Sequence, residues 1–490
     1  MGLFKTAING VAWTTISTIV RSVVQLLQVS ILTRFLEKSD FGIVAIATLF
    51  VGFSSIFLDM GISIGILHKQ DISRNEFSSL FWLNLLSGII LTTILMVVAP
   101  YISHAYSEPE LTIVLQLLCI TVFFSSLGNQ HRTVQQKKLK FGTIAVIEVS
   151  CSIFTLALAI VLALNGYGIF SLVYSTLFNV MSSNILFLFV GLKQDGNIYF
   201  HFSVNETIPY LKIGSFSIGT QILDFFSREI DVIIISATLG KDTLGVYSLC
   251  KRLVTALYSS ITPIYSKVLT PLISSLQNNK KQIHEVFYNA IETICLINFP
   301  IFLAVAIGSS SIIYVFYGEQ YLEGSLVLAI LAVHYGYLSK GNPDGCLQVA
   351  YGRTDVGFYW TIFRIIIFSI ATYIGALFSV ECMAFSIFLA AQVSTPIGWY
   401  FSIYLLIHDN FWDYYKISMR PFVIAVLVAV PFYWLFGHMT AFVYVSLGIV
   451  LYFLIYAVIT YYLFSKSYAV KKAVEFIHFL TDSEARKISA

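Results

Sequence analysis

The sequence is poor in charged residues. Asp, Glu, Lys and Arg make up 11% of its 490 residues, whereas hydrophobic residues make up 57%. A soluble protein of this length needs a larger share of polar side chains to cover its surface, so the composition predicts an integral membrane protein. The formal net charge of +3 is too small to indicate a nucleic-acid partner, and no basic tract carries interleaved aromatic residues.

Cysteine and histidine are also scarce, and neither is clustered. The six cysteines are scattered through apolar segments without a C-x-x-C, and the nine histidines form no H-E-x-x-H. These spacings give no indication of a disulfide framework or a zinc site, and we expect no cofactor or metal. The sequence also lacks the long hydrophilic loops and the D-x-D motif of membrane-embedded glycosyltransferases. We therefore expect that the protein is not an enzyme.

Apolar segments, in contrast, are abundant. Each crossing of a membrane by a helix needs about 20 mainly apolar residues. Segments of roughly this length lie at 10–32, 41–66, 78–100, 111–130, 143–164, 168–192, 213–235, 243–269, 286–308, 323–339, 356–378, 382–406, 419–437 and 440–464. The sequence thus predicts an all-α, polytopic membrane protein with fourteen transmembrane helices.

Lys and Arg are unevenly divided between the two sides that these segments define. If the N-terminus is cytoplasmic, the external connections hold Arg34, Lys38 and Lys241. Most of the other basic residues, including Arg132, Lys340 and Arg353, then fall in cytoplasmic connections. This asymmetry is the one that the positive-inside rule requires. Because the number of spans is even, both termini are predicted to be cytoplasmic.

Two pairs of loop motifs indicate an internal repeat. The stretch "LEKSDFGIVA" at 36–45 matches "LGKDTLGVYS" at 239–248 with an offset of 203, and "LGNQHRTVQ" matches "KGNPDGCLQ" with an offset of 213. The aligned pairs are Leu36 with Leu239, Lys38 with Lys241, Gly42 with Gly245, Gly128 with Gly341, Asn129 with Asn342 and Gln135 with Gln348. The first six spans are therefore in register with the next six.

The repeat predicts the domain organisation. Residues 1–200 form an N-terminal six-helix lobe and residues 201–410 form a C-terminal one. Residues 411–465 add transmembrane helices 13 and 14, and residues 466–490 form a cytoplasmic amphipathic tail. Parallel repeats of this kind are typical of transporters that hold substrate between their halves and rock one half against the other.

A polar stripe interrupts the seventh span. Asp224, Arg228 and Asp231 have i, i+4, i+7 spacing, which places them within about 60° on one helix face. The repeat offset of 203 relates them to Arg21, Gln25 and Gln28 in the first span, which form a second polar stripe. Glu229 points away from the stripe. We interpret the two stripes as facing sides of a polar cavity.

Four further ionisable residues lie within apolar segments: Asp59, Glu148, Arg252 and Arg364. Each has a second interpretation, as part of an ion pair inside one bundle or, for Arg252 beside Lys251, as an interfacial anchor. In the cavity interpretation the arginines bind an anionic headgroup, because a guanidinium is a planar fork that suits phosphate or carboxylate. The predicted substrate-binding residues are Arg21, Gln25, Gln28, Arg228, Arg252 and Arg364. The predicted coupling or ion-pairing residues are Asp59, Glu148, Asp224 and Asp231.

Three stretches resemble those of Wzx-type polysaccharide flippases. They are "LTRFLEKSDFGIVAIATLF", "LGKDTLGVYSLCKRL" and "GNPDGCLQVAYGRTDVGFYWT". These flippases belong to the multidrug/oligosaccharidyl-lipid/polysaccharide exporter superfamily, and the similarity is greatest to the branch that exports colanic acid, amylovoran and teichuronic acid. It extends from about residue 5 to 465. Lys38 stands where such proteins commonly have proline in a loop.

This resemblance implies a fourteen-helix, V-shaped transporter of the bacterial inner membrane. Its substrate would be an undecaprenyl-pyrophosphate-linked oligosaccharide, moved from the cytoplasmic to the periplasmic leaflet. Further implied partners are membrane lipids, a polysaccharide polymerase and a chain-length regulator. Two alternatives are a drug or cation antiporter of the multidrug-extrusion type, which typically has twelve spans, and a membrane-embedded glycosyltransferase or polymerase.

Overall fold

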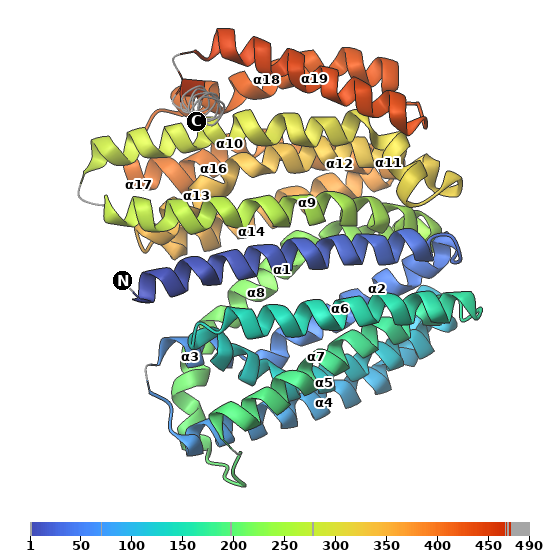
Figure 1. Ribbon diagram of the computed structural model, residues 1–490, viewed down its shortest axis with the longest axis vertical. Helices are drawn as coiled ribbons and strands as arrows, with labels where there is room; N and C mark the ends of the chain where they lie inside the picture. Colours follow the sequence, from blue (N-terminus) through green and yellow to red (C-terminus); the bar gives the residue numbers. More distant parts are fainter. Residues whose placement is uncertain are drawn as a thin grey trace, which may run out of the picture. The chain divides into compact units, whose positions relative to one another are not determined.

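The computed structural model describes residues 2–69, 71–196, 198–276, 279–465, 467 and 470–471. Every regular element in this part of the chain is a helix. Most of the amphipathic tail predicted at 466–490 lies outside the described residues. The chain divides into two compact units, Met1–Leu249 (unit 1) and Cys250–Ala490 (unit 2), which Figure 1 colours from blue to green and from green to red. The lobe boundary predicted at 200/201 stays a prediction.

Unit 1 contains eight helices and the start of a ninth, α9, which crosses the unit boundary. They are α1 (Gly2–Leu32), α2 (Lys38–Asp59), α3 (Ile62–His68), α4 (Arg74–Tyr106), α5 (Glu110–Lys137), α6 (Phe141–Leu164), α7 (Ile169–Asp195), α8 (Val204–Thr238) and α9 (Gly240–Ser275). Within this unit α5 packs between α4 and α7, α1 packs along α6, and α8 packs against α2 and α3 (Figure 1).

Unit 2 is built from long helices interrupted by short ones. After α9 come α10 (Lys280–Ile307), α11 (Ser309–Phe316), η1 (Glu319–Gly324), α12 (Ser325–Leu338), η2 (Ser339–Gly341), α13 (Asn342–Ala350), α14 (Thr354–Ala376), α15 (Val380–Val393), α16 (Thr395–Trp399), the π-helical η3 (Tyr400–Tyr404), α17 (Leu405–Ile407), α18 (Phe411–Phe436) and α19 (Phe442–Leu463). The core of this unit forms where α10 packs against α12 and α18.

The predicted polytopic membrane fold is confirmed. Among the described residues, eleven helices are long and apolar enough to cross a membrane. The count rises to twelve if the pair Val380–Val393 and Thr395–Ile407, bent by 42°, is one span. The remaining two predicted spans, 213–235 and 243–269, coincide with α8 and α9. These helices of 35 and 36 residues are long enough to cross but carry more charge than the others.

The glycines paired by the repeat make a reciprocal contact. A Cβ atom on Gly42 would lie 2.0 Å from the carbonyl oxygen of Lys241, and one on Gly245 would lie 2.0 Å from that of Lys38. The first turns of α2 and α9 therefore touch backbone to backbone, and only glycine fits at either position. Two residues that the repeat aligns thus take equivalent places on the two sides of one contact.

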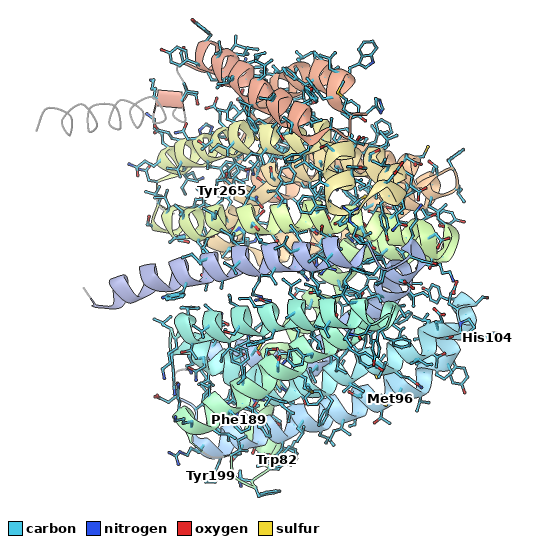
Figure 2. The ribbon with its side chains drawn as sticks, turned by 45° about the vertical axis from the view of Figure 1, so that its right-hand side comes forward. Trp82, Met96, His104, Phe189, Tyr199 and Tyr265 are labelled. Carbon is cyan, nitrogen blue, oxygen red and sulfur yellow. The ribbon has the colours of Figure 1, made fainter. Side chains whose placement is uncertain are left out.

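Hydrogen bonds from Trp82 and Arg74 to Tyr199 hold one end of α4 in unit 1. Trp82 and Tyr199 lie close together there in Figure 2, with Met96 and then His104 farther along α4. The indole Nε1 of Trp82 donates a hydrogen bond of 2.9 Å to the carbonyl oxygen of Tyr199. Arg74 donates one of 3.0 Å to the Tyr199 hydroxyl. Tryptophan and tyrosine favour the membrane–water boundary, so this end of α4 fits that depth.

Candidate functional site: a carboxylate between two arginines

Glu148 on α6 lies between two arginines in unit 1. Arg21 Nη1 on α1 is 2.5 Å from Glu148 Oε2, and Arg132 Nε on α5 donates a 2.9 Å hydrogen bond to Oε1. The Glu148 side chain is 13% exposed, whereas the two arginine side chains are 47% and 41% exposed. One carboxylate balances one of the two guanidinium charges, so the cluster keeps a net charge of +1. We call these three residues the Arg21–Glu148–Arg132 cluster.

Local chain geometry explains how the cluster forms. The helices α5 and α6 form an antiparallel hairpin whose connection at 138–140 contains Leu139 with a positive φ of 56°. Arg132 and Glu148 are equally far along the chain from Lys140, so the hairpin brings them opposite each other. Arg21 reaches the same carboxylate because α1 packs along α6.

The other members of the first polar stripe differ in their surroundings. Gln28 Nε2 donates a 3.0 Å hydrogen bond to Oγ of Ser175, a fully buried residue on α7. Gln25 is exposed. Gln28 therefore links α1 to α7, whereas Gln25 and Arg21 present polar groups at the helix surface.

The second stripe, on α8, is graded from exposed to buried. Asp224 and Arg228 are exposed, whereas Asp231 is 9% exposed. The hydroxyl of Tyr247 on α9 donates a 2.5 Å hydrogen bond to Asp231 Oδ2. Asp231 thus holds α8 against the start of α9 inside unit 1. Whether the two stripes line one cavity stays a prediction.

Asp59 belongs to a separate polar cluster at the end of α2. Its Oδ1 accepts hydrogen bonds from Oγ of Ser63 at 2.5 Å and from Nδ2 of Asn129 at 3.1 Å. The chain leaves the helix directly after Asp59, through Met60 and Gly61, both with positive φ. A Cβ on Gly61 would lie 2.1 Å from Cα of Gly214, so α8 crosses tightly over this break.

The last two predicted substrate-binding residues, Arg252 on α9 and Arg364 on α14, are half-buried and belong to unit 2. Their convergence with residues of unit 1 on one substrate stays a prediction.

Near the predicted cytoplasmic end of unit 1, a hydrogen bond to Glu76 raises the pKa of the Lys69 ammonium. Lys69 thus remains a cation, as an anchor at the membrane boundary requires.

Sequence reasoning missed two basic residues. Arg132 and Lys340 both follow apolar segments, and both were assigned to cytoplasmic connections. Arg132 instead lies inside α5, and Lys340 is only 6% exposed, in the core of unit 2. Assigning Lys340 to a loop was therefore wrong. The equal spacing of Arg132 and Glu148 from the hairpin turn could have identified Arg132, whereas no comparable signal marked the burial of Lys340.

Comparison with known sequences identifies the family. A model of the family described as polysaccharide biosynthesis protein matches residues 31–326. The chain is 26% identical over 430 residues to the teichuronic acid biosynthesis protein TuaB of Bacillus subtilis, covering 87% of this chain and 88% of TuaB. It is also 26% identical over 437 residues to the lipopolysaccharide biosynthesis protein WzxC of Escherichia coli, covering 88% of each. The succinoglycan biosynthesis transport protein ExoT of Rhizobium meliloti is 22% identical, with coverage of 89% and 88%.

Solved structures show the same fold. The lipid II flippase MurJ in an inward closed conformation matches with a TM-score of 0.71 and 16% identity, over 92% of this chain and 99% of MurJ. An inward-facing MATE-family multidrug resistance transporter of the MOP superfamily matches with a TM-score of 0.64 and 16% identity, over 82% and 98%. The resemblance to Wzx-type polysaccharide flippases is confirmed, and the chain belongs to the polysaccharide biosynthesis protein family.

Proposed function

We propose that this protein translocates a lipid-linked oligosaccharide across the bacterial inner membrane and that the Arg21–Glu148–Arg132 cluster receives the phosphate groups of the lipid carrier. The observation that carries this proposal is a pair of half-exposed arginines held at one carboxylate within a membrane-embedded bundle. Carrier and cargo follow from the family: the substrate class is undecaprenyl-pyrophosphate-linked repeat units for exopolysaccharide, O-antigen or capsule.

The geometry of the cluster suits an anion that binds reversibly. Two guanidinium groups can each offer paired N–H donors to phosphate oxygens. Glu148 fixes both arginines while the site is empty, and it limits the cost of holding two like charges close together. An arriving pyrophosphate competes with Glu148 for the same donors, so binding is exchangeable. A transporter needs such exchange, because it must release what it binds.

The proposal includes the finer topology. All fourteen segments cross the membrane, with α8 and α9 as the two most polar spans, and both termini are cytoplasmic. The long helices α8 and α9 tolerate their charges because polar spans that face a cavity rather than lipid avoid the cost of burial in hydrocarbon. A polysaccharide polymerase and a chain-length regulator are proposed as partners that receive the translocated units.

The main alternative is a drug or cation antiporter. The structural likeness to a MATE-family transporter supports the shared fold, which both functions use. The family match and the relatives named for polysaccharide biosynthesis favour the oligosaccharide substrate instead. Two arginines with a net positive charge also suit an anionic headgroup better than an organic cation.

The test is a deletion strain complemented with variants. Arg21→Gln and Arg132→Gln each keep side-chain polarity but lose the positive charge. We expect each to reduce surface polysaccharide at least tenfold and to raise lipid-linked repeat units inside the cell, with unchanged protein level in the membrane. The matched control is Arg353→Gln, an exposed arginine of unit 2 that bonds its neighbour Asp355. Normal polysaccharide output from both cluster variants would refute the assigned site.

A further inference from the structure

Lys340 is a buried cation in unit 2. It lies in η2, between α12 and α13, and is 6% exposed. Its Nζ donates hydrogen bonds to the Tyr337 hydroxyl at 2.6 Å and to Thr395 Oγ1 at 3.2 Å, and these two hydroxyls are 2.7 Å apart. Both partners are neutral. The ammonium therefore has hydrogen bonds but no carboxylate in direct contact.

Asp344 lies one helical turn farther on, in the first turn of α13. Its Oδ2 accepts a hydrogen bond of 3.4 Å from the Tyr414 hydroxyl. Its Oδ1 is buried and has no hydrogen-bond partner among the described residues. Lys340 and Asp344 are not joined by an ion pair within 4.0 Å in this part of the chain, although the charge of each acts on the other.

The polar groups around the pair are mainly neutral: phenols, one thiol and the Thr395 hydroxyl. The titratable side chains that face it are Tyr288 and Cys295 from α10, Tyr337 from α12 and Tyr414 from α18. The carboxylates of Asp409 and Asp413 also act on Tyr288, and that of Glu292 acts on Cys295. Asn298 on α10 is fully buried; its Oδ1 accepts from Tyr265, labelled in Figure 2, and its Nδ2 has no partner in the described structure. Asn298 Nδ2 and Asp344 Oδ1 are thus both buried polar atoms of unit 2 without a partner among the described residues.

Such an arrangement is costly if both groups stay ionised. A buried charge is stabilised only when it is paired and hydrogen-bonded, and a carboxylate oxygen without a donor meets neither condition. A proton on Asp344 removes one of the two charges. Ionisable groups at membrane depth are in general sites of function rather than of packing.

We propose that Lys340 and Asp344 form a proton-binding site in unit 2, with Asp344 as the group that takes up and releases the proton. An O–H bond forms at Asp344 when hydronium gives up its proton and leaves water, and the reverse step restores the carboxylate. Lys340 remains an ammonium and sets the proton affinity of Asp344. Using this proton to drive translocation rests on the proposed function, whereas proton binding itself does not.

The site is placed so that its charge affects packing. Lys340 and Asp344 flank Gly341 and Pro343, where the 3-10 turn η2 joins α12 to α13 within the span Glu319–Ala350. Lys340 contacts α12 and α16 through hydroxyls, and Asp344 contacts α18. When Asp344 is ionised it attracts Lys340 across the junction of η2 and α13, and when it is protonated this attraction ends. The charge state therefore biases how α13 sits against its neighbours.

Proton binding is tested by infrared difference spectroscopy on the purified full-length protein, comparing acidic with alkaline buffer. We expect a protonated-carboxyl signal that is lost in Asp344→Asn. It should persist in Glu319→Gln, which removes an exposed carboxylate of the same unit. A wild-type signal that survives in Asp344→Asn would overturn the proposal, as would a signal that follows sodium concentration rather than pH.

Coupling is tested by transport in vesicles with an imposed pH gradient. Lys340→Met with Asp344→Asn removes both buried charges, so it avoids the unpaired charge that could unfold a single variant. We expect the double variant to fold, and we expect its gradient-driven transport rate to fall at least tenfold. A merely structural pair predicts full gradient dependence in the double variant, which would overturn the coupling role. If wild-type protein shows the carboxyl signal but no oligosaccharide transport, the proposed function fails and the proton site stands.

Discussion

Units 1 and 2 build the same inter-helix contact from different side chains. In unit 1, Nδ2 of Asn129 donates to Asp59 at 3.1 Å, and in unit 2 Nδ2 of Asn342 donates to Oγ1 of Thr262 at 3.4 Å. The two asparagines are paired by the repeat, and the loop offset of 203 relates Asp59 to Thr262. The contact has thus been kept while its charge differs.

The backbone next to this contact is broken in unit 1 and carries a proline within a continuous helix in unit 2. After Asp59 the chain turns through Met60 and Gly61 with positive φ, and after Thr262 comes Pro263 inside α9. Proline removes a helical hydrogen bond. The helix α9 is therefore weakened at the position that the repeat aligns with the end of α2. Unit 1 therefore has a carboxylate beside a full helix break, whereas unit 2 has a hydroxyl there and its buried carboxylate at Asp344. The repeat fixes backbone contacts more strictly than it fixes the positions of charges.

The largest difference between the two contacts is expected when the side chain that accepts the asparagine hydrogen bond is removed, at Asp59 in unit 1 or at Thr262 in unit 2. Asp59→Leu leaves the Asn129 amide and the Ser63 hydroxyl without their acceptor, so we expect a loss of about 3 kcal/mol in the free energy of unfolding. Thr262→Val removes a neutral acceptor in a longer hydrogen bond and should cost about 1 kcal/mol. Thermal unfolding in detergent measures both. Equal losses would show that the charge at Asp59 adds nothing to the contact.

Copying the unit 2 side chain into unit 1 sharpens the same comparison. Asp59→Thr restores a hydroxyl acceptor for Asn129, so we expect most of the stability lost in Asp59→Leu to return and transport to stay within about threefold of wild type. A complete loss of transport in this stable variant would make Asp59, in place of Asp344, the carboxylate that transport requires.

The reciprocal glycines test whether the contact between α2 and α9 is symmetric. Gly42→Ala and Gly245→Ala each force a methyl group against a backbone carbonyl. Each should therefore lower the free energy of unfolding by about 2 kcal/mol, and the two losses should be similar. Gly219→Ala is the matched control, because a Cβ there meets nothing within 4 Å. Unfolding temperatures that differ strongly between the first two variants would contradict a symmetric contact.

The sequence predicted much of the fold because the first pair of repeat motifs marks the first turns of α2 and α9, where the backbones touch. Gly42 and Gly245 matched in sequence for the same reason that they touch Lys241 and Lys38: neither position accepts a side chain. The cluster residues were harder to predict. Arg21 and Glu148 were both singled out, but helix periodicity does not reveal which helix neighbours α1, so their pairing was not foreseen. Counting charges in connections also treats Lys340 and Arg353 alike, although one is buried and the other exposed.

The smallest effect is expected at the ion pair of Lys69 and Glu76 in unit 1, whose side chains are 40% and 19% exposed. Lys69 bonds Glu76, which raises the pKa of the ammonium above its ordinary value. Its contribution to stability is therefore complete at neutral pH and is lost as pH rises through that raised pKa. Lys69→Met should lower the unfolding temperature slightly in dilute buffer and not at all at high salt, because salt screens exposed charges. A large effect that persists at high salt would contradict a surface role.

The most direct test of the central claim is a flipping assay in reconstituted vesicles. Undecaprenyl-pyrophosphate-linked oligosaccharide is placed in one leaflet, and its appearance in the other is followed with a membrane-impermeant sugar-modifying reagent. We predict that wild-type protein and Arg353→Gln move the lipid, and that the double variant Arg21→Gln with Arg132→Gln moves it no faster than empty vesicles. Wild-type rates from the double variant, or no movement by the wild-type protein, would contradict the account.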